Sequence, residues 1–380
     1  MSIHPKIPKI LLEREPSISS PAIIYDYNSI VSTVLKIKND IDIIPNVELC
    51  FAIKANRNRN ILKILSDLGL GADVASIHEL NIAKEVGINP IYSTSPVYSE
   101  EFLEELFRSD ITPDFNSLSQ LGKYVNKYNL NEIGIRIKVP LNLSNSDITY
   151  GEKSRFGIDI DSTDYIEYMR DKNLKIKQIH FHLGELQNSS VIKNVMEYIT
   201  LISNRFQDLE VINIGGGLTY LYSDETEVKK SWETVKENIL LINKGFNREI
   251  KVVIEPGMLV LAMSGYLYSK VQSSDFVNNK RIVTLDCSAW NLTHWAYPVL
   301  VQSYSDSINA EEHTIAGNTC YENDIFISSE NHRILKINDG LLMTPVGAYV
   351  ASMARSMHGY PLPNEWILKD DNFIKAGDYL

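Results

Sequence analysis

Short apolar runs rich in isoleucine and valine recur from residue 48 to residue 255, and each is followed by apolar residues at three- and four-residue spacing. This alternation predicts β-strands that alternate with amphipathic helices. Eight such units in about 210 residues have the length and rhythm of a (β/α)8 barrel. The expected strands are residues 48–54, 72–75, 90–94, 112–115, 132–138, 177–182, 210–214 and 250–255.

The pattern changes after residue 265, where strand-like runs follow one another without long helices between them. This part predicts an antiparallel β domain, which residues 22–26 "AIIYD" join as an N-terminal strand. We therefore expect an α/β barrel over residues 28–265 and a β domain built from residues 1–27 and 266–380.

Composition narrows the possible partners. Hydrophobic residues make up 44% and charged residues 22% of the chain, as in ordinary globular proteins. The net charge of −11, without a lysine- or arginine-rich tract, argues against nucleic acid or an anionic membrane as a partner. Cys50, Cys287 and Cys320 are odd in number and lack metal-type spacing, which favours a reducing compartment. There is no long apolar stretch and no signal-peptide core, so we expect a cytoplasmic protein.

Polar residues gather where the expected barrel strands end, which is where such barrels place their active sites. Each has a simpler explanation by itself: a lysine reaching water, a structural histidine, a tight glycine turn. Together they offer an amine, an imidazole that can stack on a flat ring, a carboxylate, and backbone amides that can hold an anion. These groups complement pyridoxal phosphate. The residues are Lys54, Asp73, Ser76, Arg136, His182, Gly215, Gly216, Gly217 and Glu255.

Several short motifs then follow in one order along nearly the whole chain. They are "FAIKAN", "GADVAS", "HFHLGE", "NIGGGL", "IEPG", "GNTCYENDIF" and "PVGAYVASMARSMHGYPLPNE". In these motifs the chain resembles the fold-type III pyridoxal-phosphate decarboxylases, the group that holds ornithine, diaminopimelate and carboxynorspermidine decarboxylases. The family has an alanine racemase-like barrel followed by a β domain, as the pattern predicts here.

The resemblance implies roles for individual residues. Lys54 would bind the cofactor aldehyde as an imine, His182 would stack on the ring, and Glu255 would bond the ring nitrogen. Gly215, Gly216 and Gly217 would hold the phosphate with help from Tyr349, and we place Asp73 with these cofactor-binding residues. Cys320 resembles a cysteine that reaches in from a partner subunit, which implies a homodimer with shared active sites. Cys320 is also the candidate proton donor, with His182 and Lys54 as alternatives.

Four positions depart from the family pattern. Met258 stands where many members have arginine, Glu185 replaces a small polar residue, Tyr321 replaces an acid after the cysteine, and "DCSAWNLTHWAYP" has no acid in its second half. We expect Glu185 to turn toward the substrate or to be neutralised by Arg155 or another base.

The missing acids disfavour plain ornithine or lysine, because a buried terminal ammonium would have no partner. We expect a larger or non-standard diamino acid or conjugate, such as a carboxylated polyamine or a siderophore or natural-product precursor. Its candidate contacts are Tyr321, Glu185, Arg155 and Tyr297. Diaminopimelate decarboxylation proper, amino acid racemisation (disfavoured by Glu255, because related racemases place arginine there) and a non-catalytic binding regulator remain alternatives.

Overall fold

The computed structural model describes residues 6–141, 149–295 and 297–377. The chain divides into two compact units. The first contains Val34–Lys54 and Leu62–Leu259, and the second contains Ala55–Ile61 together with the described residues of His4–Thr33 and Val260–Leu380. In the described part of the chain, none of the helices combines the length and the apolar character that a bilayer-spanning segment needs.

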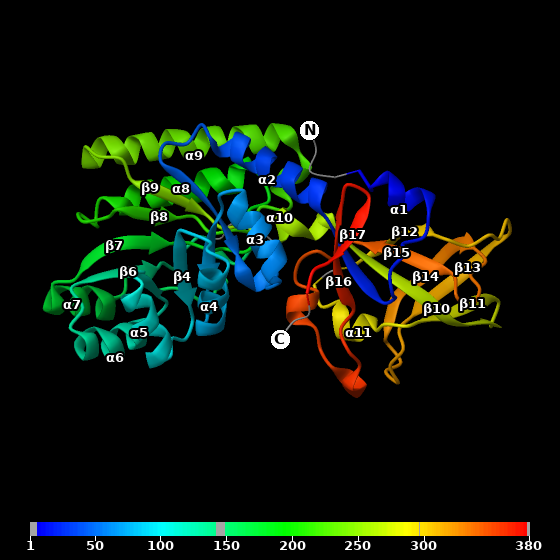
Figure 1. Ribbon diagram of the computed structural model, residues 1–380. Helices are drawn as coiled ribbons and strands as arrows, with labels where there is room; N and C mark the ends of the chain where they lie inside the picture. Colours follow the sequence, from blue (N-terminus) through cyan, green and yellow to red (C-terminus); the bar gives the residue numbers. More distant parts are fainter. Residues whose placement is uncertain (1–5, 142–148, 296, 378–380) are drawn as a thin grey trace. The chain divides into compact units, whose positions relative to one another are not determined.

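The first unit holds a closed barrel of parallel strands that are paired in sequence order, and the last strand pairs with the first (Figure 1). The strands are β2 (Val47–Ala52), β3 (Gly71–Val74), β4 (Ile91–Ser95), β5 (Pro113–Phe115), β6 (Glu132–Arg136), β7 (Lys175–His180), β8 (Val211–Asn213) and β9 (Lys251–Ile254). The predicted barrel is confirmed. Three strands end two residues earlier than expected, β2 at Ala52, β6 at Arg136 and β7 at His180, and Ile53–Ala55 after β2 forms a 3-10 turn, η1.

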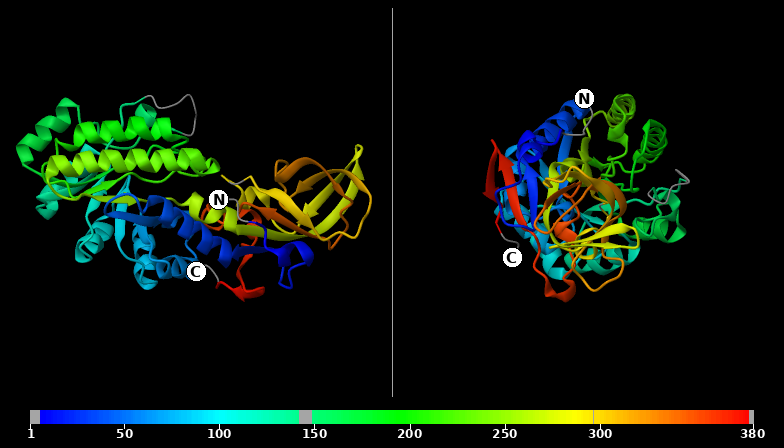
Figure 2. Two further views of the ribbon diagram at one scale, coloured as in Figure 1. Left: turned by 90° about the horizontal axis from the view of Figure 1, so that it is seen from above. Right: turned by 90° about the vertical axis from the view of Figure 1, so that its right-hand side faces the viewer.

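Helices follow the strands, and several of them begin at a serine that caps the first turn. Ser76, Ser99 and Ser117 each accept a hydrogen bond from a backbone amide of the first turn, as N-caps do. Figure 2 shows the two helices α8 and α9 side by side. The helices are α2 (Tyr27–Ile41), α3 (Arg59–Asp67), α4 (Ile77–Glu85), α5 (Glu100–Arg108), α6 (Leu118–Tyr128), α7 (Thr163–Lys172), α8 (Ser189–Ser203), α9 (Glu225–Phe246) and α10 (Met258–Leu261).

The second unit is built on a sheet of nine strands, whose main path runs β14-β13-β11-β10-β1-β16-β17, with β15 pairing both β10 and β12. Its short helices are α1 (Lys9–Glu13) and α11 (Ala289–Leu292). The strands are β1 (Ala22–Asp26), β10 (Gly265–Val277), β11 (Lys280–Leu285), β12 (Val299–Ser303), β13 (Ala310–Ala316), β14 (Ile325–Arg333), β15 (Gly340–Thr344), β16 (Asn364–Lys369) and β17 (Asn372–Lys375).

The expected N-terminal strand is confirmed, because β1 lies in the middle of this sheet. The predicted antiparallel β domain is also confirmed, although two pairs within its mostly antiparallel sheet are parallel: β1 with β16, and β11 with β13. Strands joined by long connections are not bound to the alternating direction of a hairpin. One face packs Leu11, Ile24, Tyr266, Leu342 and Leu368 into a buried core.

Candidate active site

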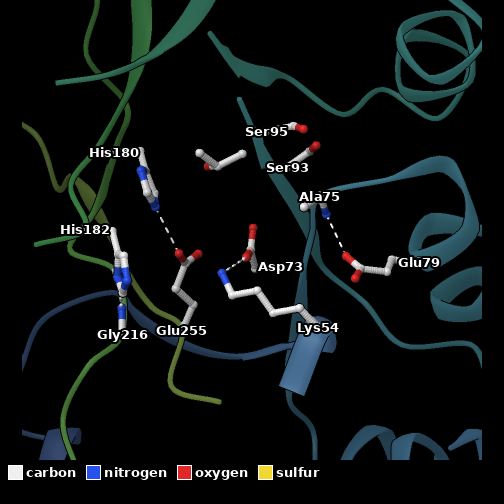
Figure 3. A network of polar contacts seen from close by, with 12 residues as sticks. Lys54, Asp73, Ala75, Glu79, Ser93, Ser95, His180, His182, Gly216 and Glu255 are labelled. Carbon is white, nitrogen blue, oxygen red and sulfur yellow. Dashed lines mark hydrogen bonds and ion pairs between the residues drawn. The ribbon is translucent and has the colours of Figure 1, made fainter. Parts of the chain in front are cut away.

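Lys54 lies in the turn η1 directly after β2, at the end of the barrel where the carboxyl ends of the parallel strands meet. Its Nζ is 3.7 Å from Oδ2 of Asp73, which comes from the neighbouring strand β3 (Figure 3). The Lys54 side chain is 47% exposed, whereas that of Asp73 is 3% exposed. Burial raises the pKa of Asp73 well above its usual value, the charge of Glu255 adds to this, and the charge of Lys54 opposes it.

Glu255 follows β9, is buried, and is held by one side chain from the neighbouring strand β8 and one from β7, the strand beyond it. His180 Nε2 lies 2.9 Å from its Oε1, and Asn213 Nδ2 donates to its Oε2 at 2.8 Å. Figure 3 shows the carboxylate between His180 and Lys54. Burial raises the pKa of Glu255, and the charge of Lys54 opposes this most strongly. Each oxygen keeps a lone pair for a further hydrogen bond.

The two histidines of "HFHLGE" contact different groups. Burial, together with the charges of Arg136 and Lys54, lowers the pKa of His180 well below its usual value. His180 is therefore a neutral ring that donates its Nε2–H to Glu255. His182 lies beyond the end of β7, and the amide of Gly216 points at its Nδ1 over 3.4 Å. Burial lowers the pKa of His182 in the same direction.

Neither His180 nor Asn213 was predicted from the sequence as a contact of Glu255. The position of His180 was the sequence signal for its orientation. Residues two apart on a strand share a face, so His180 faces the same side of β7 as Gln178. Asn213 is the last residue of β8 and is fully buried.

The glycine turn after β8 has a shape that only glycine adopts easily. Gly215 and Gly217 have φ values of 75° and 78°. A Cβ on Gly215 would lie 2.3 Å from the carbonyl oxygen of Phe181, and one on Gly217 would lie 1.7 Å from that of Gly184. The amide of Gly215 is bound by Asn213 Oδ1 at 2.9 Å. The turn thus passes tightly between its neighbours with backbone amides at the strand end.

Glu185 and Arg155 do not pair as expected. Oε2 of Glu185 accepts hydrogen bonds from the amides of Thr219 (3.0 Å) and Tyr220 (3.4 Å). The Arg155 guanidinium instead stacks on the ring of Phe156 at 3.9 Å. The expected neutralisation of Glu185 by Arg155 is therefore corrected, because backbone amides take that part and the described residues show no ion pair between the two side chains.

The remaining predicted residues lie in the second unit. Cys320 is exposed, and its amide donates to Nε2 of His358 at 3.1 Å. The ring of Tyr321 lies 4.4 Å from that of Trp290. Tyr297 is 84% exposed. Tyr349 has a φ of 57°, and its amide donates to the carbonyl of Ala55 at 2.8 Å.

Arg355, which was not predicted from the sequence, stacks on the indole of Trp290, with its guanidinium 4.0 Å from the ring centre. The signal for it was a lone cation within "VASMARSMHGY", a segment that is otherwise free of lysine and arginine.

The residues at the end of the barrel fit pyridoxal phosphate. Lys54 supplies an amine beside Asp73, whose Oδ1 is buried and has no hydrogen-bond partner among the described residues. Glu255 supplies an oriented carboxylate, His182 a neutral ring, and the glycine turn backbone amides. These side chains follow β2, β9, β7 and β8, whose carboxyl ends meet at one mouth.

Comparison with known proteins points the same way. Residues 28–262 match the model of the family described as "Pyridoxal-dependent decarboxylase, pyridoxal binding domain". The diaminopimelate decarboxylase of Buchnera aphidicola is 28% identical over 85% of this chain and 84% of its own length. That of Escherichia coli K12 is 26% identical over 82% and 81%.

Solved structures share the fold. A diaminopimelate decarboxylase of M. jannaschii superposes with a TM-score of 0.83 over 95% of this chain and 90% of its own, at 21% identity. The arginine decarboxylase of Paramecium bursaria Chlorella virus gives 0.76 over 92% and 96%, at 18% identity.

Proposed function

The chain belongs to the pyridoxal-dependent decarboxylases, and from this we propose that it removes the α-carboxylate of an amino acid whose distal end carries a second carboxylate. Its family makes the protein a pyridoxal-phosphate-dependent carboxy-lyase acting on an amino acid. The observation that carries the substrate proposal is the position of Arg355.

We assign the cofactor-facing roles to the residues at the barrel mouth. Pyridoxal phosphate, when bound, supplies an electron sink for the charge that a departing carboxylate leaves behind. Lys54 would hold its aldehyde, His182 would lie against its ring, and the glycine turn would hold its phosphate. Glu255, oriented by His180 and Asn213, would keep a proton at the ring nitrogen. An acid at this position favours decarboxylation over racemisation.

Arg355 lies in residues 349–358, a segment whose two ends form hydrogen bonds with Ala55 and Cys320. At one end the amide of Tyr349 binds the carbonyl of Ala55, the residue after Lys54. At the other end, His358 accepts a hydrogen bond from the amide of Cys320. Between them Arg355 stacks on Trp290, which in turn contacts Tyr321. We propose that Arg355 binds the distal end of the substrate.

A guanidinium stacked on an indole presents its N–H edge, which matches the geometry of a carboxylate. Arg355 is exposed, and no carboxylate of the described residues forms an ion pair with it. The curated relatives named above are diaminopimelate decarboxylases. Diaminopimelate carries a second carboxylate, as do larger acidic conjugates, whereas lysine and ornithine do not. Both lines of support favour an acidic distal end.

We also propose that two copies of the chain share their active sites through Cys320, and that the enzyme works in the cytoplasm. The buried free thiols of Cys50 and Cys287 suit a reducing compartment.

The substrate proposal is tested by measuring CO2 release from meso-diaminopimelate, larger acidic diamino conjugates, lysine, ornithine and arginine. We expect turnover of substrates with a distal carboxylate and at least about 100-fold lower kcat/KM without it, because the guanidinium would be left without its partner. Arg355→Ala should raise KM by about tenfold or more and change kcat less, as expected for a lost charged hydrogen bond. Arg333→Ala, at the end of β14, is the control.

Equal turnover of lysine, or an unchanged KM in Arg355→Ala, would show the substrate proposal to be wrong. Tight cofactor binding without CO2 release from any amino acid would instead favour the non-catalytic regulator.

A further inference from the structure

The carboxylate of Glu185 accepts hydrogen bonds from backbone amides immediately beyond the glycine turn. Its Oε2 accepts from the amides of Thr219 at 3.0 Å and Tyr220 at 3.4 Å, two and three residues after Gly217. The side chain is partly buried, and burial raises its pKa while these amides lower it. The chain therefore places an anionic group of its own on amides that adjoin the proposed phosphate site.

The backbone of Glu185 is held on both sides, so the carboxylate cannot leave by a movement of the loop alone. Leu186 donates its amide to the carbonyl of Gly217 at 2.6 Å. The hydroxyl of Thr149 donates to the carbonyl of Glu185 itself. Gly184 packs so closely on Gly217 that a Cβ there would lie 1.7 Å from the Gly184 oxygen. The carboxylate can leave these amides only by rotation of its side chain, and it loses its charge only by taking up a proton.

A phosphate and a carboxylate use the same donors. Both accept hydrogen bonds from backbone amides in a turn, and both are anionic near neutral pH. Two anions on adjoining amides repel each other, and this is stronger away from bulk water. Met258, the first residue of α10, adds no cation after the Glu255-Pro256-Gly257 segment.

We propose that Glu185 is an internal anion that opposes binding of the cofactor phosphate: its carboxylate occupies the amides next to the glycine turn, so that cofactor binding must move or neutralise this carboxylate. Glu185 is thus a positioning residue, which sets how much the phosphate contributes to cofactor affinity. The inference rests on the proposed function, since it takes the glycine turn as the phosphate site.

A binding cycle isolates the competition between the two anions. Pyridoxal phosphate and pyridoxal, which lacks the phosphate, are titrated by absorbance into the wild type and into Glu185→Gln, with Lys54→Ala as the background for reaction at other lysines. Glutamine keeps an oxygen that accepts from both amides but carries no charge. Glu152→Gln, an exposed glutamate of the same unit in the 3-10 turn η2 (Gly151–Lys153), is the matched control.

We expect Glu185→Gln to bind pyridoxal phosphate at least about tenfold more tightly, to change pyridoxal affinity by less than about twofold, and the control to change neither. Glu185→Ser, a second neutral variant, should shift in the same direction and serves if the glutamine variant does not fold. A shift that is absent, or equal for both compounds, would overturn the inference.

Failure of the proposed function has a different signature. If borohydride reduction and mass spectrometry find no cofactor on Lys54 in the wild type or in the variants, both proposals fall. If the cofactor is found on Lys54 with equal affinity in wild type and Glu185→Gln, only the competition is wrong.

Discussion

Single residues at the barrel mouth depend on one another through charge. Burial raises the pKa of Asp73 and of Glu255, and the positive charge of Lys54 opposes this rise in both. Burial, together with the charges of Arg136 and Lys54, lowers the pKa of His180 and keeps that ring neutral. Removing one member therefore changes the protonation of the others.

Lys54→Ala should abolish both the absorbance of bound cofactor and CO2 release, because it removes the amine that would bind the cofactor aldehyde. Absorbance spectra and borohydride labelling of Lys54 provide the measurement. Lys63→Ala is the control, since Lys63 is an exposed helix residue paired with Asp67. A Lys54→Ala protein that keeps the spectrum and the activity would refute the assignment.

Asp114 predicts a dependence of stability on pH. Its buried carboxyl accepts from Thr94 and Gln178 through Oδ2, whereas Oδ1 has no hydrogen-bond partner among the described residues. Burial raises its pKa from 3.8 to about 8. The folded state therefore keeps a proton that the unfolded chain releases, and stability falls as pH rises from about 4 to about 8.

Asp114→Asn should remove this loss of stability with rising pH, because the NH2 of asparagine can take the place of the protonated carboxyl oxygen. In urea unfolding, the variant should gain on the wild type as pH rises from about 4 to about 8, reaching at least about 2 kcal/mol, and should keep a constant advantage above that range. Asp171→Asn, on the exposed end of α7, should show no such trend. A difference that is the same at every pH would count against a proton on Asp114.

At the scale of elements, the site is made by turns that follow regular strands. Strand β2 gives way to the short turn that carries Lys54, and β8 gives way to the glycine turn. Helix α4 begins at the cap Ser76, so a short connection joins it to the strand that carries Asp73. The barrel strands define where these turns lie, and the turns determine which side chains and amides face the mouth.

Gly217→Ala should disrupt the glycine turn, because φ is 78° and the added Cβ would lie 1.7 Å from the Gly184 oxygen. We expect a loss of about 2 kcal/mol or more in unfolding free energy and a large loss of cofactor affinity. Gly122→Ala, in helix α6 with open space at its Cβ, should stabilise the protein by up to about 1 kcal/mol. Urea unfolding and cofactor titration measure both variants. If Gly217→Ala kept its affinity for the cofactor, the glycine turn would not be the phosphate site.

At the scale of the whole molecule, the proposed homodimer with shared sites divides one reaction between two chains. Lys54 and Cys320 belong to different compact units of the chain. If Cys320 acts in the site of the partner subunit, each active site takes Lys54 from one chain and Cys320 from the other.

This arrangement predicts complementation. Lys54→Ala and Cys320→Ala homodimers should each be weakly active or inactive, and a mixture that is allowed to exchange subunits should recover up to about a quarter of the wild-type activity. The reason is that half of the dimers are then mixed, and each mixed dimer has one intact site. CO2 release before and after exchange is the measurement. No recovery, with exchange shown by native mass spectrometry, would place Cys320 in its own chain's site or outside catalysis.

The order of apolar and polar positions determined much of this protein by itself. Strand and helix periodicity are local properties, so the eight barrel strands and the N-terminal strand of the sheet were predictable from residue spacing alone. Because parallel strands in a barrel end at the same mouth, the positions of Lys54, His182, Glu255 and the glycine turn near one another followed from the strand order.

Only the tertiary structure decided which polar groups meet. His180 and Asn213, from β7 and β8, both bind Glu255 after β9. Glu185 turns to the amides of Thr219 and Tyr220 and not to Arg155, and Arg355 lies on Trp290. These contacts join residues far apart in sequence and depend on rotamers and strand register, which periodicity does not encode. The raised pKa of Asp114 has the same origin, since burial is a property of the packed barrel and not of the segment that contains the residue.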